Sequence, residues 1–245
     1  MKFDPYYMIT VVMPQLIAAV PLTLFLTFAS SIIGNLLAVP VAVARLSPSP
    51  LLSLPARAFI FTMRGTPLLI QLYFVYYGLG QVFPRWVMQD MPFLRDGLWY
   101  ALFAFSINTA GYTGEILRGA IMAVPHGEIE AGRAFGMNRR QVFFRITLPR
   151  AVRICLPAMS TETVLLLKAT SIASLVTVYE VMGTATTIRV DTYRVYDTLI
   201  GAGIVYFVIV YGMTRTLNWL ERRLNKDRMP VSANPPRLAS DQGIV

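Results

Sequence analysis

Charge is the scarcest property of this sequence. Charged residues make up 14% of the chain, against about 25% in a soluble globular domain, and none lies between Asp4 and Arg45. A helix needs about 20 apolar residues to cross the hydrocarbon core of a bilayer, so this run is long enough to cross once. A cleaved signal peptide has an apolar core of only about 7–15 residues. We therefore interpret the run as an uncleaved first membrane helix.

Cysteine and histidine each occur once, as Cys155 and His126. A single cysteine excludes an internal disulfide, and a single histidine without neighbouring ligands gives no reason to expect a metal site. The sequence has no cysteine pair, histidine cluster or carboxylate pair at catalytic spacing, so we expect no catalytic residues and disfavour a membrane enzyme. It also lacks the G-x-x-x-x-G-K-[S/T] loop that binds nucleotide phosphates, so any ATP would be hydrolysed by another chain.

The uncharged runs predict an all-α membrane protein with five spanning helices. Helices are expected because backbone polar groups inside a bilayer must be satisfied within each span, and these runs far exceed the length of barrel strands. The predicted spans are approximately residues 17–44, 57–84, 97–117, 154–179 and 197–218. Residues 1–16 precede this membrane domain of residues 17–225, and 118–153 connect its third and fourth spans. The proline-containing, polar tail at 226–245 is expected to be disordered.

The distribution of basic residues predicts the orientation of the spans. The net charge is +9, and lysine and arginine are concentrated in residues 45–64, 118–153 and 215–237. Cytoplasmic segments carry the basic excess in membrane proteins, so we expect the N-terminus outside and the C-terminus in the cytoplasm. A nucleic-acid-binding protein would instead carry an aromatic-interleaved basic patch on a soluble domain, and we discard that interpretation.

The connection at 118–153 contains a motif with fixed spacing. Glu130-Ala131-Gly132 is followed after three residues by Gly136, and after nine more by Ile146, Leu148 and Pro149. Acidic residues in a first helical turn favour a helix start near 128, and Gly136 is expected to end that helix. The spacing resembles the cytoplasmic signature of membrane subunits of ATP-binding-cassette (ABC) importers, with Gly132 in place of an alanine. The alternative is an ordinary amphipathic segment lying on lipid headgroups.

Three further stretches resemble the polar amino-acid permeases of that class. Residues 64–72 read R-G-T-P-L-L-I-Q-L, and residues 108–121 resemble the third span of those permeases. Residues 168–171 read K-A-T-S, similar to the family's K-D-T-S with alanine in place of aspartate. The resemblance extends over about residues 17–225, and is greatest to the M-type subunit of histidine, lysine-arginine-ornithine and opine (octopine, nopaline) uptake systems.

This resemblance implies a type I importer permease in the bacterial inner membrane, with a coupling helix between spans 3 and 4. The implied partners are a paralogous Q-type permease, two cytoplasmic ATP-binding subunits that hold ATP and magnesium, a periplasmic solute-binding protein and membrane lipid. The implied coupling residues are Glu130, Ala131, Gly132, Gly136, Ile146, Leu148 and Pro149. No cofactor is expected on this chain. Glutamine, glutamate or another polar amino acid remains an alternative cargo, and the permease pair is either two copies or two paralogues. A self-sufficient secondary transporter is the more distant alternative, although five spans do not divide into two repeats.

Charged and polar residues inside spans are the candidates for contact with solute, because a charge in a bilayer is costly. Asn108, Tyr112 and Glu115 fall on one face of the third predicted helix. The candidate substrate path is Arg64, Thr66, Asn108, Tyr112 and Glu115, with Glu162 and Lys168 as further intramembrane polar residues. The competing interpretation for Arg64 and Glu115 is that they are boundary residues whose side chains extend to the membrane interface.

Overall fold

The computed structural model describes residues 3–79 and 96–224, and all regular structure in these residues is helical. The prediction of an all-α protein is thereby confirmed for the described part. The tail predicted at 226–245 and the last residues of the second predicted span, 80–84, lie outside the described residues.

The first helical stretch is continuous and longer than predicted. It comprises α1 (Pro5–Tyr7), the π-helical turn η1 (Met8–Val12) and α2 (Met13–Leu46), so the helix begins well before residue 17. Asp4 caps its N-terminus, and its carboxylate accepts hydrogen bonds from the backbone N–H groups of Tyr6 and Tyr7. The N-terminal segment is therefore part of the helical structure.

The second predicted span is not one helix. α3 (Pro50–Gly65) ends at Thr66, and α4 (Leu68–Tyr73) with the π-helical η2 (Phe74–Leu79) continues at 109° to it. Thr66 and Pro67 have extended backbone conformations. Proline lacks an N–H group and disfavours a helical conformation in the residue before it. The prediction of a single helix from residue 57 onward is therefore wrong, and the chain bends at Thr66-Pro67.

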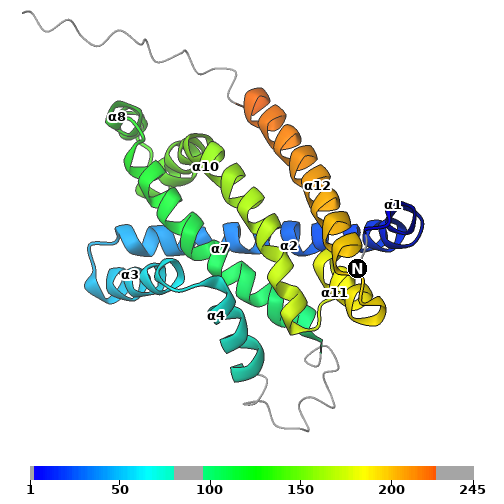
Figure 1. Ribbon diagram of the computed structural model, residues 1–245. Coiled ribbons are helices and arrows are strands. Elements are labelled where there is room, and N and C mark those ends of the chain that lie inside the picture. The colour runs from blue at the N-terminus through cyan, green and yellow to red at the C-terminus, as the bar shows by residue number, and fades with distance from the viewer. Residues whose placement is uncertain (1–2, 80–95, 225–245) are drawn as a thin grey trace, which may run out of the picture.

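The remaining elements follow in the predicted order, with one addition. They are α7 (Gly97–Met122), α8 (His126–Ala134), α9 (Arg139–Val142), η4 (Phe143–Thr147), α10 (Leu148–Ala169), the 3₁₀ helix η5 (Thr170–Val176), α11 (Val181–Thr192) and α12 (Val195–Leu224). The addition is α11, which lies in the connection between the fourth and fifth predicted spans. In Figure 1, α8 and the end of α12 lie at one end of the bundle, whereas α1 and α11 lie together at another.

Within the part of the chain that the structure describes, three stretches are long and apolar enough to cross a membrane: Pro5–Leu46, Arg139–Val176 and Val195–Leu224. The bent pair of α3 and α4 passes the same test as one broken span. α7 does not qualify within the described residues, since it carries many glycine, threonine and other polar residues. It contacts α2, α3, α4 and α10, and much of its surface is buried. A helix enclosed by other helices does not need an apolar surface toward lipid.

Small residues let α7 approach its neighbours closely. A Cβ atom on Gly111 would lie 2.5 Å from Met63 Cβ of α3, and one on Gly114 would lie 3.0 Å from Val41 Cγ1 of α2. Gly34 of α2 has the same relation to α7, with Thr109 Cβ at 2.6 Å. Close helix contacts at small residues are typical of membrane bundles. They fix α7 at the centre of the bundle, where its polar side chains face the other helices.

Candidate functional site

The bend between α3 and α4 borders a cavity of about 240 Å³. Thr66 lies at the bend, Asn108 and Tyr112 come from α7, and Glu162 comes from α10. Three of the five predicted substrate-path residues therefore line one cavity, together with a carboxylate that the sequence marked only as intramembrane. Ala169, the position at which the resembling motif has aspartate, lines the same cavity.

Two side-chain amides satisfy the backbone at this bend. Gln71 Nε2 of α4 donates to the carbonyl oxygens of Met63 (2.9 Å) and Thr66 (3.2 Å) and to Thr66 Oγ1 (2.8 Å). Asn108 Nδ2 donates to Gln71 Oε1 (2.9 Å) and to the Met63 carbonyl (3.3 Å). A broken helix at membrane depth frees carbonyl groups that have no water to bind, so they need such donors. The sequence reasoning missed this role of Gln71, although proline at 67 followed by an amide four residues later was a visible signal.

Arg64 and Glu115 lie at a second cavity, of about 430 Å³, lined by Arg45, Arg57, Ile60, Phe61, Arg64, Gly65 and Glu115. Glu115 forms an ion pair with Arg118 at 2.7 Å. The guanidinium carbon of Arg64 lies 5.6 Å from the centroid of the Tyr112 ring. The predicted polar stripe on α7 is thus divided: Asn108 and Tyr112 line the first cavity, and Glu115 lines the second.

The other two intramembrane charges lie apart. Lys168 borders two further cavities between α10 and α12, one with Glu221 and one with Tyr206, and does not line the cavity of Glu162. Glu180 was not identified from the sequence, yet it is fully buried. It accepts hydrogen bonds from the Tyr206 hydroxyl and the backbone N–H of Gly183, and so joins α11 to α12. Within residues 3–79 and 96–224 no three potential metal ligands are grouped together.

The helix predicted to start near Glu128 and end at Gly136 is present as α8. Gly136 has φ +78°, in the left-handed region that favours glycine. Its N–H donates to the Arg133 carbonyl (2.9 Å), and the Met137 N–H donates to the Gly132 carbonyl (3.1 Å). This pair of bonds is the Schellman arrangement that ends helices. The prediction that Gly136 terminates this helix is confirmed.

The motif positions on either side of this turn contact each other. A Cβ atom on buried Gly132 would lie 2.5 Å from Ile146 Cδ1, so α8 packs directly against η4. Glu128 forms an ion pair with Arg150 of α10 at 3.3 Å, and Ile129 and Leu148 pack against a buried cluster from α2, α7 and α10. Glu130, Ala131 and Pro149 are exposed, as is Phe135, at 86%. The segment is therefore a packed projection with an exposed outer surface.

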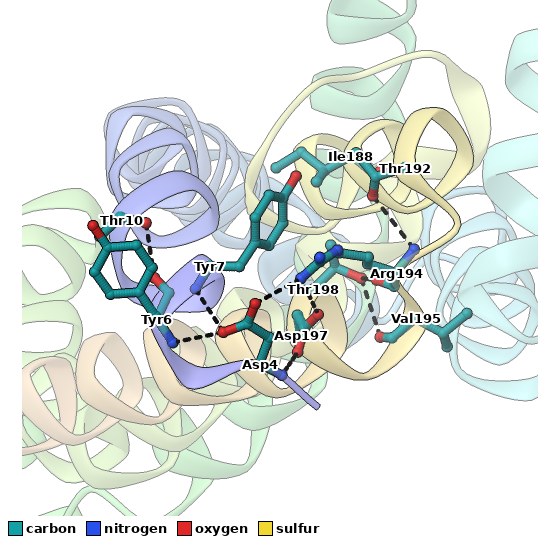
Figure 2. A network of polar contacts seen from close by, with 10 residues as sticks. All are labelled: Asp4, Tyr6, Tyr7, Thr10, Ile188, Thr192, Arg194, Val195, Asp197 and Thr198. Carbon is teal, nitrogen blue, oxygen red and sulfur yellow. Dashed lines mark hydrogen bonds and ion pairs between the residues drawn. The ribbon is translucent and has the colours of Figure 1, made fainter. Parts of the chain in front are cut away.

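A polar network ties the N-terminus to the start of α12 (Figure 2). The Asp4 N–H donates to Asp197 Oδ1 at 2.9 Å, and one Arg194 nitrogen lies 3.4 Å from both carboxylates. The Arg194 guanidinium carbon lies 4.0 Å from the centroid of the Tyr7 ring. The Tyr7 N–H and then Arg194 hold the pKa of Asp4 below its usual value, because both favour the charged carboxylate. We name Asp4, Tyr7, Arg194 and Asp197 the N-terminal clasp.

The chain is similar to membrane components of transport systems, both by a family model and by individual relatives. Residues 34–226 match the family described as "Binding-protein-dependent transport system inner membrane component". The chain is 42% identical to the octopine transport system permease protein of Rhizobium radiobacter, over 92% of this chain and 94% of that protein. It is 36% identical to the histidine/lysine/arginine/ornithine transport system permease protein of Escherichia coli (strain K12), over 88% and 91%.

Solved structures extend the likeness to three dimensions. One is the crystal structure of an amino acid ABC transporter with histidines, with a TM-score of 0.78 and 31% identity over 91% of this chain and 100% of that one. An inward-facing MetNI methionine ABC transporter has a TM-score of 0.72 at 19% identity, over 91% of this chain and 99% of that one. This second likeness concerns the fold alone.

Proposed function

Because the chain belongs to the inner-membrane permease family of binding-protein-dependent transport systems, we propose that its cargo is a basic amino acid or an opine. It is a non-catalytic permease subunit of M type, and ATP is hydrolysed by a separate subunit. The observation that carries the cargo proposal is the 42% identity to an octopine permease over nearly the full length of both chains. Glutamine, glutamate or another polar amino acid is the second candidate cargo.

We propose that the chain crosses the membrane five times, with α7 as the span that hydropathy does not identify. Its 26 residues extend for about 39 Å at 1.5 Å per residue, which exceeds the hydrocarbon thickness of about 30 Å. The sequence predicts a membrane domain of residues 17–225 between segments 1–16 and 226–245, and we propose that this domain instead begins with the helical stretch at Pro5. The basic residues of 45–64 and 118–153 favour a cytoplasmic position for these segments. This supports the proposal that the N-terminus is periplasmic and the C-terminus is cytoplasmic.

We propose that residues 118–153 couple this subunit to its ATPase, with α8 as the coupling helix. Force transmission needs an element with few internal degrees of freedom, and this segment has three internal constraints. They are the Schellman turn at Gly136, the contact of Gly132 with Ile146 and the ion pair of Glu128 with Arg150. The exposed Glu130, Ala131 and Phe135 would face the ATPase. The other proposed partners are a second ATP-binding subunit, a Q-type paralogue and a periplasmic binding protein.

For the solute path we propose the cavity at the bend between α3 and α4. Glu162 would attract the cationic group of the solute, and Thr66, Asn108 and Tyr112 would offer polar groups around it. Arg64 lines the neighbouring cavity, and its guanidinium lies over the Tyr112 ring. Its positive charge therefore lies close to the proposed solute site without lining it. The bend matters here, because discontinuous helices are a recurrent way to expose backbone and polar groups to a solute within a bilayer.

The proposed function is tested by uptake into proteoliposomes that contain the whole importer with its binding protein. We expect ATP-dependent accumulation of radiolabelled arginine or octopine, and none with this chain alone. Uptake of glutamine in place of both would support the second cargo. Accumulation by this chain without an ATPase would overturn the assignment and revive a secondary transporter driven by an ion gradient.

A further inference from the structure

The cavity beside Glu115 is strongly basic. Arg45 at the end of α2 and Arg57 and Arg64 on α3 line it, and Glu115 is the only carboxylate among its lining residues. The Glu115 carboxylate is already held by Arg118 at 2.7 Å. None of the three lining arginines forms an ion pair within residues 3–79 and 96–224. The cavity therefore holds three guanidinium groups that form no ion pair in the described residues, beside one carboxylate that is already bound by Arg118, and its excess of positive charge suits an anionic ligand.

The surface around this cavity is apolar. Leu54, Arg57, Phe61 and Arg64 are spaced three, four and three residues apart, so they form one stripe along α3. Leu54 is 57% exposed and Phe61 is 78% exposed, and both arginines are exposed as well. Ile60 and Phe61 also line the cavity. Basic groups thus alternate with exposed apolar groups, which a site for a small water-soluble anion does not require.

We propose that this cavity binds the headgroup phosphate of an anionic phospholipid, with an acyl chain lying along Leu54 and Phe61. Guanidinium groups bind phosphate oxygens in bidentate geometry, and basic pockets between membrane helices are typical headgroup sites. Free inorganic phosphate shares the headgroup chemistry, but it would gain nothing from the exposed apolar stripe, so we commit to lipid. The site goes beyond the proposed transport function, and only its placement in the cytoplasmic leaflet rests on the proposed orientation.

The test measures which lipids stay with the protein. The purified whole importer is equilibrated in micelles with equal amounts of phosphatidylglycerol and phosphatidylcholine, and retained lipids are counted by native mass spectrometry. We expect retention of phosphatidylglycerol over phosphatidylcholine in the wild type. Arg45→Gln and Arg57→Gln should each lower this preference by about fivefold, as expected for one basic contact to a headgroup. Arg57→Lys, which keeps the charge, should lower it less.

The matched control is Arg222→Gln. Arg222 is an exposed basic residue near the end of α12, on the same proposed side of the membrane, and it lines no part of this cavity. If Arg222→Gln lowered the preference for phosphatidylglycerol equally, the preference would come from general surface charge, and the proposed site would be overturned. Displacement of the lipid by millimolar inorganic phosphate would indicate a free-anion site instead. Unchanged lipid retention with loss of a partner subunit in Arg57→Gln would indicate a protein contact. Because lipid retention is measured without transport, failure here leaves the cargo assignment untouched.

Discussion

At the scale of single residues, the contact of Gly132 with Ile146 gives a structural reason for glycine at this position of the importer signature. The importer signature that this segment resembles has alanine there, and here a Cβ atom would meet the terminal Cδ1 of Ile146 at 2.5 Å. That methyl group is the far end of a flexible side chain, so it can move aside for one carbon atom. A larger side chain would have to separate α8 from η4.

We therefore expect Gly132→Ala to transport normally and Gly132→Leu to uncouple transport from ATP hydrolysis. Overpacking of this kind costs about 1–3 kcal/mol, enough to change the population of the packed segment by about fivefold to a hundredfold. The measurement is the ratio of solute taken up to ATP hydrolysed in proteoliposomes. Gly132→Leu combined with Ile146→Ala should recover part of the ratio, since the second change supplies space.

Gly127 provides the matched control on the same helix. A Cβ atom on Gly127 meets no other atom within 4 Å, so Gly127→Leu adds the same side chain without contact inside the segment. We expect it to leave the ratio unchanged. Equal uncoupling by Gly127→Leu and Gly132→Leu would show that the Gly132–Ile146 contact is not what matters.

At the scale of elements, the bend between α3 and α4 depends on Gln71. Its amide donates to the carbonyls of Met63 and Thr66, and Asn108 orients it through Gln71 Oε1. We expect Gln71→Leu to lower the melting temperature of the detergent-solubilised importer by about 2–10 °C, since it removes hydrogen bonds to Met63 and Thr66 that contribute about 0.5–1.5 kcal/mol each. A fluorescence melting curve measures this. Solute uptake should fall as well, because Thr66 of the bend lines the proposed solute cavity.

Gln15→Leu is the control for this change. Gln15 is exposed on α2, and in the described residues its amide donates to the Val11 carbonyl one turn earlier in the same helical stretch. The same exchange of amide for leucine should leave the melting temperature within about 2 °C, as is usual for surface substitutions. If Gln71→Leu melts no lower than Gln15→Leu, the amide does not stabilise the bend.

The elements that sequence predicted well are those whose chemistry is local. The end of α8 at Gly136 follows from glycine's access to positive φ, and long uncharged runs locate most of the helices.

The bend at Thr66-Pro67 was missed because a long uncharged run was interpreted as one continuous helix, although proline at position 67 is a helix-breaking residue. The bond of Glu180 with Tyr206 and the position of Glu115 beside Arg45, Arg57 and Arg64 could not be predicted, since each brings together residues of elements distant in sequence. Glu115 was predicted to share a helix face with Asn108, but it forms an ion pair with Arg118 and lines a different cavity from Asn108.

At the scale of the whole molecule, the two ends of the bundle are held by different means. At one end α8 packs on η4 and is joined to α10 by the ion pair of Glu128 with Arg150. At the other end the N-terminal clasp joins the first and last long helices, because Asp4 precedes α1 and both Arg194 and Asp197 lie at the start of α12 (Figure 2). Glu180 reinforces that end by joining α11 to α12. The helices at this end are therefore joined to one another by part-buried polar contacts.

The clasp gives the last prediction, which concerns pH. Its carboxylate Asp4 has a pKa below the ordinary value of about 3.9, so its contribution to stability is complete above that value and is lost as the pH falls through the lowered pKa. Hydrogen exchange of the amides of residues 5–12, corrected for the intrinsic pH dependence, should stay protected from pH 7 to about 4 and lose protection only below that. Arg194→Gln removes one of the groups that lower the pKa of Asp4 and should shift the loss of protection to higher pH. Substitution of Arg189, a basic residue of α11 outside the clasp, by Gln should not shift it. Loss of protection already near pH 6 in the wild type, or the same midpoint in Arg194→Gln, would show that Asp4 does not hold the N-terminus.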